Sequence, residues 1–114
     1  MEAFLKELND IAAALRQEAN ALAADSRQDE ADLNKIRANI YEVCATIGGV
    51  SGKIAPAGEW EPVFRGKLAQ LPKNWQTALQ AARNHGNEER AAVEELKLAA
   101  LADVLARLDR RKEG

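Results

Sequence analysis

A regular apolar stripe in the first half of the chain is the feature that most constrains its fold. Five branched side chains recur at steps of three, four, three and four residues, so all of them fall on one face of an α-helix. The positions between them are mostly polar or small. One helix cannot bury such a stripe by itself, so the spacing predicts a packing seam that other helices must cover. The seam residues are Leu33, Ile36, Ile40, Val43 and Ile47.

The composition extends this expectation to the whole chain. Apolar residues make up 46% and charged residues 30% of the 114 positions, a balance typical of a folded globular protein. Only 4% of the residues are aromatic, whereas the good helix formers Ala, Leu, Glu, Lys, Arg and Gln dominate. We therefore expect an all-α protein, a four-helix bundle of up-down-up-down order, in which residues 1–114 form a single domain.

Periodicity and capping residues predict where the helices begin and end. Ser26 is followed three residues later by Asp29, which resembles an N-cap pattern and predicts a break between the first two helices. One continuous rod is the alternative, because no Gly or Pro precedes Gly48 and because Leu22 lies eleven residues before Leu33. Such a rod would have to bury its stripe against a second chain. The predicted helices span residues 2–24, 27–48, 62–84 and 88–111.

Glycine and proline predict two interruptions of the helical pattern. Four glycines and a proline within residues 48–60 predict a long irregular loop between the second and third helices. Loops of this length are often functional or mobile. Pro72 predicts a break in the third helix, because proline cannot donate a backbone hydrogen bond. Gly86 and Asn87 suit the end of that helix and the N-cap of the last one.

The net charge indicates which partners to expect, and the cysteine content indicates the cellular compartment. The net charge is −2, from 16 basic and 18 acidic residues, so we expect no general attraction to nucleic acid or to anionic membranes. No run of 18 apolar residues predicts a membrane span, and the first residues do not resemble a signal peptide. The lone Cys44 cannot form an internal disulfide, which suits a cytoplasmic protein.

Basic side chains gather near the end of the last predicted helix. Cations there complement the negative end of the helix dipole. Asp103 and Asp109 interleave with them, so we interpret the group as helix stabilisation rather than as an anion-binding patch. The cations are Arg107, Arg110, Arg111 and Lys112.

No reactive constellation emerges from the rest of the sequence. Residues 48–53, GGVSGK, have three rather than four positions before the Gly-Lys pair and follow a helix, so they do not fit a phosphate-binding loop. Cys44 has no activating partner nearby and is expected to be a small buried hydrophobe, and His85 is expected to cap a helix. The acidic pairs 88–89 and 94–95 are interpreted as solvated surface. We therefore expect no metal, no cofactor and no enzymatic activity.

The aromatic residues carry the only candidate site. Three of them lie within sixteen residues, around the predicted loop and the broken helix. They can form a core cluster, or they can line a pocket under the loop that binds a peptide, a partner helix or a small ligand. The candidate contact residues are Tyr41, Trp60, Phe64 and Trp75.

Two functions from different classes follow from these observations. The first is a non-enzymatic protein–protein interaction or scaffold module that binds a protein partner or associates with itself as a homodimer, because apolar helix surface is in surplus. The second is a small-molecule-binding or sensor module, in which the 48–60 loop and the Trp60, Phe64 and Trp75 cluster form the pocket. A fold of this kind does not by itself decide between them.

Overall fold

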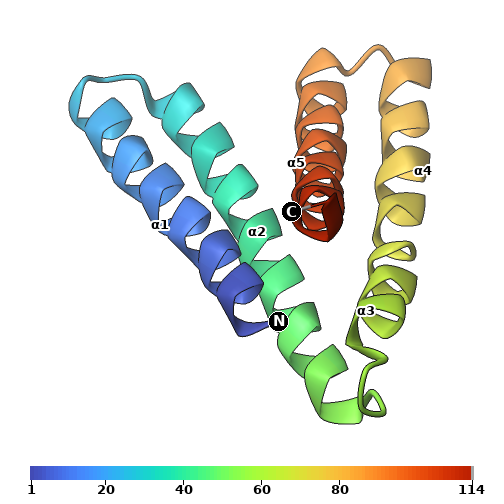
Figure 1. Cartoon of the computed structure of the whole chain (residues 1–114). Coiled ribbons are helices and arrows are strands. Elements are labelled where there is room, and N and C mark those ends of the chain that lie inside the picture. Colours follow the sequence, from blue (N-terminus) through green and yellow to red (C-terminus); the bar gives the residue numbers. More distant parts are fainter. Residues whose placement is uncertain (114) are drawn as a thin grey trace.

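A computed structural model describes residues 1–113 of the chain, with side chains through Arg111. Within these residues the chain forms helices joined by short turns and no strand, which confirms the all-α prediction (Figure 1). The side chain of Lys112, the last cation of the predicted basic group, lies outside the described residues. The helices are α1 (Glu2–Ala24), α2 (Gln28–Ile54), α3 (Trp60–Leu68), α4 (Leu71–Asn84) and α5 (Glu88–Glu113).

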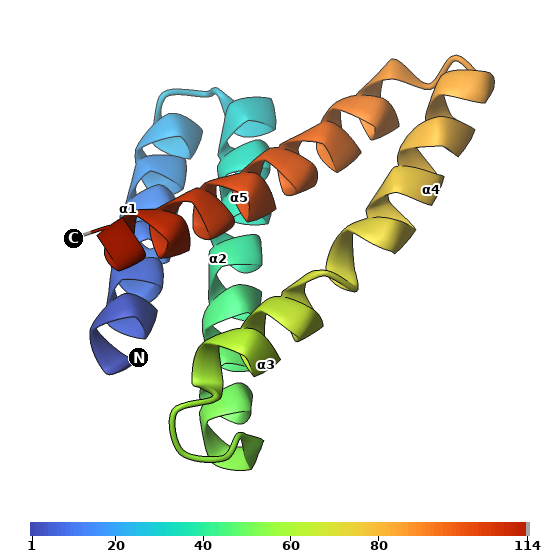
Figure 2. The same ribbon diagram turned by 45° about the vertical axis from the view of Figure 1, so that its right-hand side comes forward.

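The helices form two antiparallel hairpins that diverge from one another. α1 and α2 form the first hairpin, α3 and α4 together make one bent helix, and α5 turns back along α4. This gives the predicted up-down-up-down order (Figure 1). α5 crosses α2 near the middle of α2, so its C-terminal half lies on the first hairpin while its N-terminal half leans away with α4 (Figure 2). The outline is a V whose mouth lies at the two hairpin turns.

The two hairpin turns share one backbone arrangement. Ser26 (φ 60°) and Gly86 (φ 67°) are left-handed, and the amides that follow them reach back to Leu22 O and Ala82 O at 2.8 Å. The predicted break between the first two helices is therefore confirmed. Ser26 is not the N-cap of α2, however, because it serves as the left-handed residue that ends α1, and Arg27 takes the N-cap position instead.

The face of α2 that lies closest to α1 is a stripe of small side chains rather than the predicted seam. The buried residues of this face follow helical spacing, and Asn34 Nδ2 donates a hydrogen bond to Leu15 O on α1 (3.4 Å). Of the five seam residues, only Ile40 is buried, whereas the other four are half-buried. The seam therefore lies to one side of the α1 contact, where α5 and α3 cover only part of it. The buried stripe, which is small apart from Tyr41, is Ala31, Asn34, Ala38, Tyr41, Cys44, Ala45, Gly48 and Ser51.

The predicted loop over residues 48–60 is wrong for its first half. α2 continues through both glycines to Ile54, so the connection to α3 spans only residues 55–59. Glycine weakens a helix by about 1 kcal/mol per residue, but packing overrides that preference here. Gly48 is buried where a Cβ would run into the Leu5 side chain of α1 and would lie 3.5 Å from Phe64 of α3. The glycine that suggests a helix end in the sequence instead permits three helices to meet.

The predicted break in the third helix is confirmed and lies slightly earlier than Pro72. The chain bends at Ala69–Gln70, and Pro72 occupies the first turn of α4. Proline has no N–H for the carbonyl of Leu68, so the helical hydrogen bond at this point is missing. The Gln70 amide instead closes a tighter turn onto Lys67 O at 3.2 Å. This bend allows α4 to leave the first hairpin and pack against α5.

The two adjacent glycines of α2 provide a matched test of this packing. Gly49→Ala should raise the free energy of unfolding by up to about 1 kcal/mol, because a Cβ there meets nothing within 4 Å. Gly48→Ala should lower it by about 1–3 kcal/mol, because the methyl group displaces Leu5. Urea unfolding followed by circular dichroism measures both. Equal stabilisation by the two substitutions would show that α1 does not approach α2 at Gly48.

Candidate functional site

Two of the four predicted aromatic residues, Trp60 and Phe64, form an aromatic cluster with Phe4. The Trp60 and Phe64 rings are stacked with their centroids 4.9 Å apart, and Phe4 of α1 meets both edge-on at 6.4 and 6.2 Å. Phe64 and Phe4 are fully buried, and Trp60 Nε1 donates a hydrogen bond to Gly48 O at 2.9 Å. The rings therefore fill the space where α1, α2 and α3 meet.

Trp75 and Tyr41 lie apart from that cluster. Trp75 is half-buried on α4 and packs against the hydrophobic core. Tyr41 is buried on α2, and its hydroxyl donates a 2.5 Å hydrogen bond to Asp103 Oδ2 of α5. Arg107 Nε donates to the same oxygen at 2.8 Å and links this pair to Glu7 of α1. Tyr41 thus belongs to a hydrogen-bond network, here called the polar tie, that consists of Tyr41, Asp103, Arg107 and Glu7 and connects α1, α2 and α5.

The protonation states of Tyr41 and Asp103 are consistent with a structural role for this hydrogen-bonded group. Burial raises the pKa of Tyr41 to about 12, and the hydrogen bond to Asp103 adds to the effect, so the phenol stays protonated at neutral pH. Burial also disfavours the Asp103 carboxylate, but hydrogen bonds from Arg107 and Tyr41 outweigh it and lower the pKa of Asp103. A pocket of about 280 Å³ beside the tie is lined mainly by Ile11, Arg37, Tyr41, Leu96, Asp103 and Arg107.

The most apolar concave surface among those described lies between α2 and α5, and we name it the α2/α5 groove. It has a volume of about 350 Å³ and sits inside the V formed by the two hairpins. Leu33 and Ile36, the first two seam residues, form its α2 wall, and Ala92 and Val93 form its α5 wall. Leu33, Ile36 and Val93 are half-buried, so the seam is uncovered at this end. The remaining lining residues are Asp29, Asp32 and Glu89.

The molecule has a larger accessible surface and a larger radius of gyration than a compact monomer of the same size. Its accessible surface is 6969 Å², whereas about 6,100 Å² is expected for a compact monomer of this mass. Its Cα radius of gyration is 15.5 Å, whereas a compact domain of 114 residues has about 13 Å. The divergence of the two hairpins accounts for both differences, because it leaves the facing sides of α2 and of the N-terminal half of α5 in contact with solvent.

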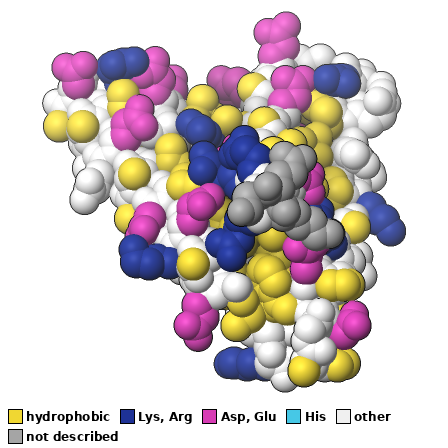
Figure 3. Space-filling model, viewed as in Figure 1, with side chains coloured by type: hydrophobic (Ala, Val, Ile, Leu, Met, Phe, Trp, Pro, Cys, Tyr) yellow, Lys and Arg dark blue, Asp and Glu magenta, His cyan; other side chains and the backbone are white. Residues whose placement is uncertain are grey.

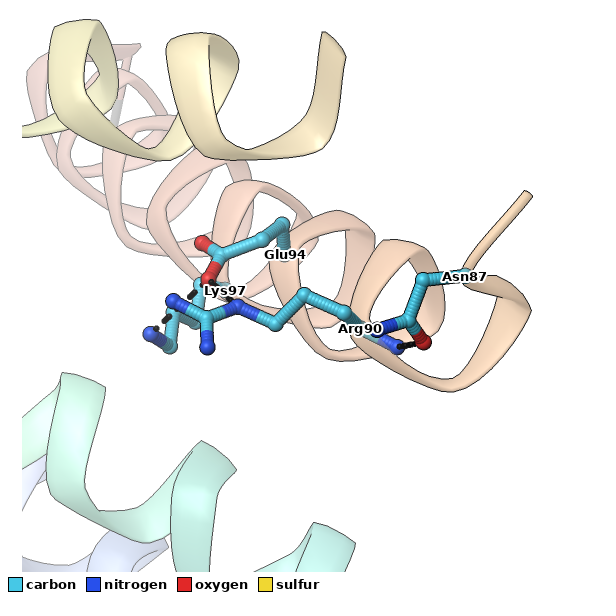
Figure 4. A network of polar contacts seen from close by, with 4 residues as sticks. All are labelled: Asn87, Arg90, Glu94 and Lys97. Atoms are coloured by element: carbon cyan, nitrogen blue, oxygen red, sulfur yellow. Dashed lines mark hydrogen bonds and ion pairs between the residues drawn. The ribbon is translucent and has the colours of Figure 1, made fainter. Parts of the chain in front are cut away.

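A buried carboxylate lies on the same part of α5. Glu94 is 1% exposed, so the expectation that residues 94–95 are solvated surface is wrong for this residue. Its Oε1 accepts hydrogen bonds from Arg90 (3.0 Å) and Lys97 (3.4 Å), as Figure 4 shows, and its Oε2 has no partner among the described residues. Asn87 caps the same helix end through the Arg90 amide, as predicted.

The remaining candidates from the sequence show no arrangement for catalysis. Cys44 is buried, and burial raises the pKa of its thiol to about 12, so it is not a thiolate at neutral pH. His85 ends α4 as its C-cap. Within the described residues, no group of three or more His, Cys, Asp or Glu side chains is arranged to hold a metal ion. Among the described helices, none combines the length and the apolar character needed to span a membrane.

Comparison with protein-family models, with curated protein sequences and with solved structures gave no match. The candidate site therefore depends on geometry alone. The sequence did not predict the α2/α5 groove as a site: it singled out Leu33 and Ile36 as part of a seam that other helices would cover. It did not identify the α5 wall, because the apolar residues of α5 are broadly distributed and only the crossing angle of α5 decides which of them face α2.

The buried carboxylate provides a test of the α4–α5 packing. Glu94→Met should raise the melting temperature by a few degrees, because it removes a buried oxygen without a partner, a group that costs about 1–3 kcal/mol. Arg90 and Lys97 stay partly exposed to water, with side chains 59% and 25% exposed, so neither becomes a stranded buried charge. Glu95→Met on the exposed face is the control. Destabilisation by Glu94→Met would contradict this expectation and show that the contacts of Oε1 with Arg90 and Lys97 outweigh the cost of the unpaired Oε2.

Proposed function

We propose that this protein is a non-enzymatic protein–protein interaction module that binds one helix of a partner protein in the α2/α5 groove. The observation that carries the proposal is the uncovered end of the apolar seam. Leu33 and Ile36 continue the helical spacing of Ile40, yet no helix of the chain covers them fully, and Val93 faces the same groove. An apolar stripe on a partner helix would complete the packing that the chain leaves unfinished.

The excess accessible surface of the molecule is large enough for a protein–protein interface of standard area. The surface exceeds that of a compact monomer by roughly 800 Å², which is about one partner's share of a standard interface. A groove with two rigid helical walls is also a common recognition mode for amphipathic helices, whose apolar side chains enter at positions i, i+3 or i+4 and i+7. Both walls of the groove are helical, so little order would have to be gained on binding.

A different protein suits the groove better than a second copy of the chain. In a symmetric dimer formed through the groove, the same surface would lie on both sides of the interface. Asp29, Asp32 and Glu89 of one copy would then face the same acids of the other, and such like-charge contacts oppose association. The homodimer predicted from the sequence is therefore the less favoured form of this proposal.

Three further expectations from the sequence are a non-enzymatic role, a cytoplasmic location and a small-molecule pocket, and the structure supports them to different degrees. A non-enzymatic role fits the groove lining, which contains carboxylates but no histidine, cysteine or serine. A cytoplasmic location fits the single unpaired thiol. The small-molecule alternative is less supported, because Trp60 and Phe64 stack on one another and because the groove is lined by other residues.

Site-specific photocrosslinking tests the proposal. A photoreactive amino acid at Ala92, an exposed position in the groove, should form an adduct with one partner protein in the source cells. The same amino acid at Ala13, exposed on α1, should not. Adding Ile36→Asp to the Ala92 variant should abolish the adduct, because a carboxylate then occupies the apolar wall.

The identified partner is then purified, and its crosslinked segment is mapped by mass spectrometry. The proposal predicts that this segment is an amphipathic helix and that the purified proteins bind with an affinity that Ile36→Asp lowers at least tenfold. Equal adducts from Ala92 and Ala13, or a Kd that Ile36→Asp leaves unchanged, would contradict it. An adduct between two copies of the chain would show that the groove binds a second copy, and it would contradict the proposal of a different partner protein.

A further inference from the structure

The apolar groove is bordered on both sides by acids that the chain does not neutralise. Asp29 and Asp32 stand on the α2 wall and Glu89 on the α5 wall. None of the three forms an ion pair with a cation of the described residues; Asp32 only accepts a hydrogen bond from the neutral Gln28 amide at 2.8 Å. In Figure 3, Asp and Glu side chains lie at the open ends of both hairpins, with Lys or Arg side chains among them.

Two of the cations nearest in sequence are held by other acids, whereas Lys35, three residues after Asp32, is exposed and forms no ion pair within the described residues. Arg27 pairs with Glu30, and Arg90 pairs with the buried Glu94. No cation is among the residues that line the groove, so its carboxylates face solvent as net negative charge. Other charges are paired, including contacts between helices such as Arg16 with Glu42 (2.5 Å) and Arg65 with Asp109 (2.7 Å).

Helix-end stabilisation explains only part of this acidic border. Asp29 lies in the first turn of α2 and Glu89 in the first turn of α5, where the helix dipole favours negative charge. Asp32 lies beyond the first turn, where that effect has faded, and it shares a helix face with Leu33, Ile36 and Asp29. A hydrogen bond from Gln28, four residues earlier, gives Asp32 a local role in α2, and its carboxylate also borders the groove.

We infer that the occupant of the α2/α5 groove is a cationic amphipathic helix, with an apolar stripe flanked on both sides by Lys or Arg. The inference rests on the proposed function and names the chemistry of the partner. The apolar stripe would lie on Leu33, Ile36 and Val93, and the flanking cations would meet Asp29 and Asp32 on one side and Glu89 on the other. This arrangement resembles the flanking charges that set partner choice beside an apolar seam in coiled coils. The charges would speed association and select the partner, while the apolar contact would hold it.

Two synthetic helices test the charge and the groove separately. Each peptide has about 18 residues, long enough to be partly helical alone, and carries the same Leu stripe. The flanking positions hold Lys in one peptide and Gln in the other. Binding to the full chain is followed by fluorescence anisotropy of labelled peptide. The Lys peptide should bind at least tenfold more tightly than the Gln peptide at 50 mM salt. That preference should largely disappear at 0.5 M salt, where exposed charges are screened.

Two double variants with the same change in net charge locate the interaction. Asp32→Asn with Glu89→Gln should weaken binding of the Lys peptide about tenfold. Glu2→Gln with Glu59→Gln should leave it unchanged, because these exposed acids lie at the closed end of the V, away from the groove mouth (Figure 1). Circular dichroism confirms that each variant is folded.

The outcomes separate this inference from the proposed function. If both peptides bind equally, with no salt dependence, and Ile36→Asp abolishes binding, the groove docks a helix and the inference about charge is wrong. If the two double variants weaken the Lys peptide equally, the attraction is a general one to an acidic protein and the inference is also wrong. If neither peptide binds, or if Ile36→Asp has no effect on binding, both the inference and the proposed function are contradicted.

Discussion

The close contact between α1 and α2 determines how the rest of the chain is arranged. Small side chains on α2, together with Gly48, allow the two helix backbones to approach along most of their length. α1 therefore occupies the small-residue face of α2 and leaves the larger seam side chains to one side. α5 and α3 then pack against that side, and the aromatic group of Phe4, Trp60 and Phe64 fills the junction.

The uncovered groove is a consequence of this arrangement. α5 crosses α2 near its middle and continues away from it with α4, so it covers the seam around Ile40 but not around Leu33 and Ile36 (Figure 2). The hydrogen-bonded group of Tyr41, Asp103 and Arg107 holds the crossing point, because it joins α5 to α2 through Tyr41 and to α1 through Glu7. Closing the V would require α5 to pivot about this tie. The openness is thus built into the contacts that hold α5, and a partner helix is the simplest way to cover the exposed apolar surface.

Local sequence patterns predicted the helices well where local chemistry determines them. The ends of α1 and α4, the Asn87 cap and the break near Pro72 follow from backbone rules that act within a few residues. The path of α2 through Gly48 and Gly49 could not be predicted in this way, because the free energy that keeps it helical comes from α1 and α3, which lie far away in the sequence. Burial of Glu94 was missed for the same reason, since its cover depends on how α4 packs against α5. Tyr41, Trp60, Phe64 and Trp75 were predicted as candidate contacts for a partner or ligand. In the structure Tyr41, Trp60 and Phe64 join helices, and Trp75 packs on the core.

We expect the V to be open in solution, and small-angle X-ray scattering of the isolated protein tests this. Data extrapolated to zero concentration, with forward scattering that confirms a monomer, should give a radius of gyration at or above the 15.5 Å of the Cα trace. A monomer with a radius of gyration near 13 Å, the value typical of a compact domain of this length, would show that the hairpins close on one another and that no groove is left for a partner.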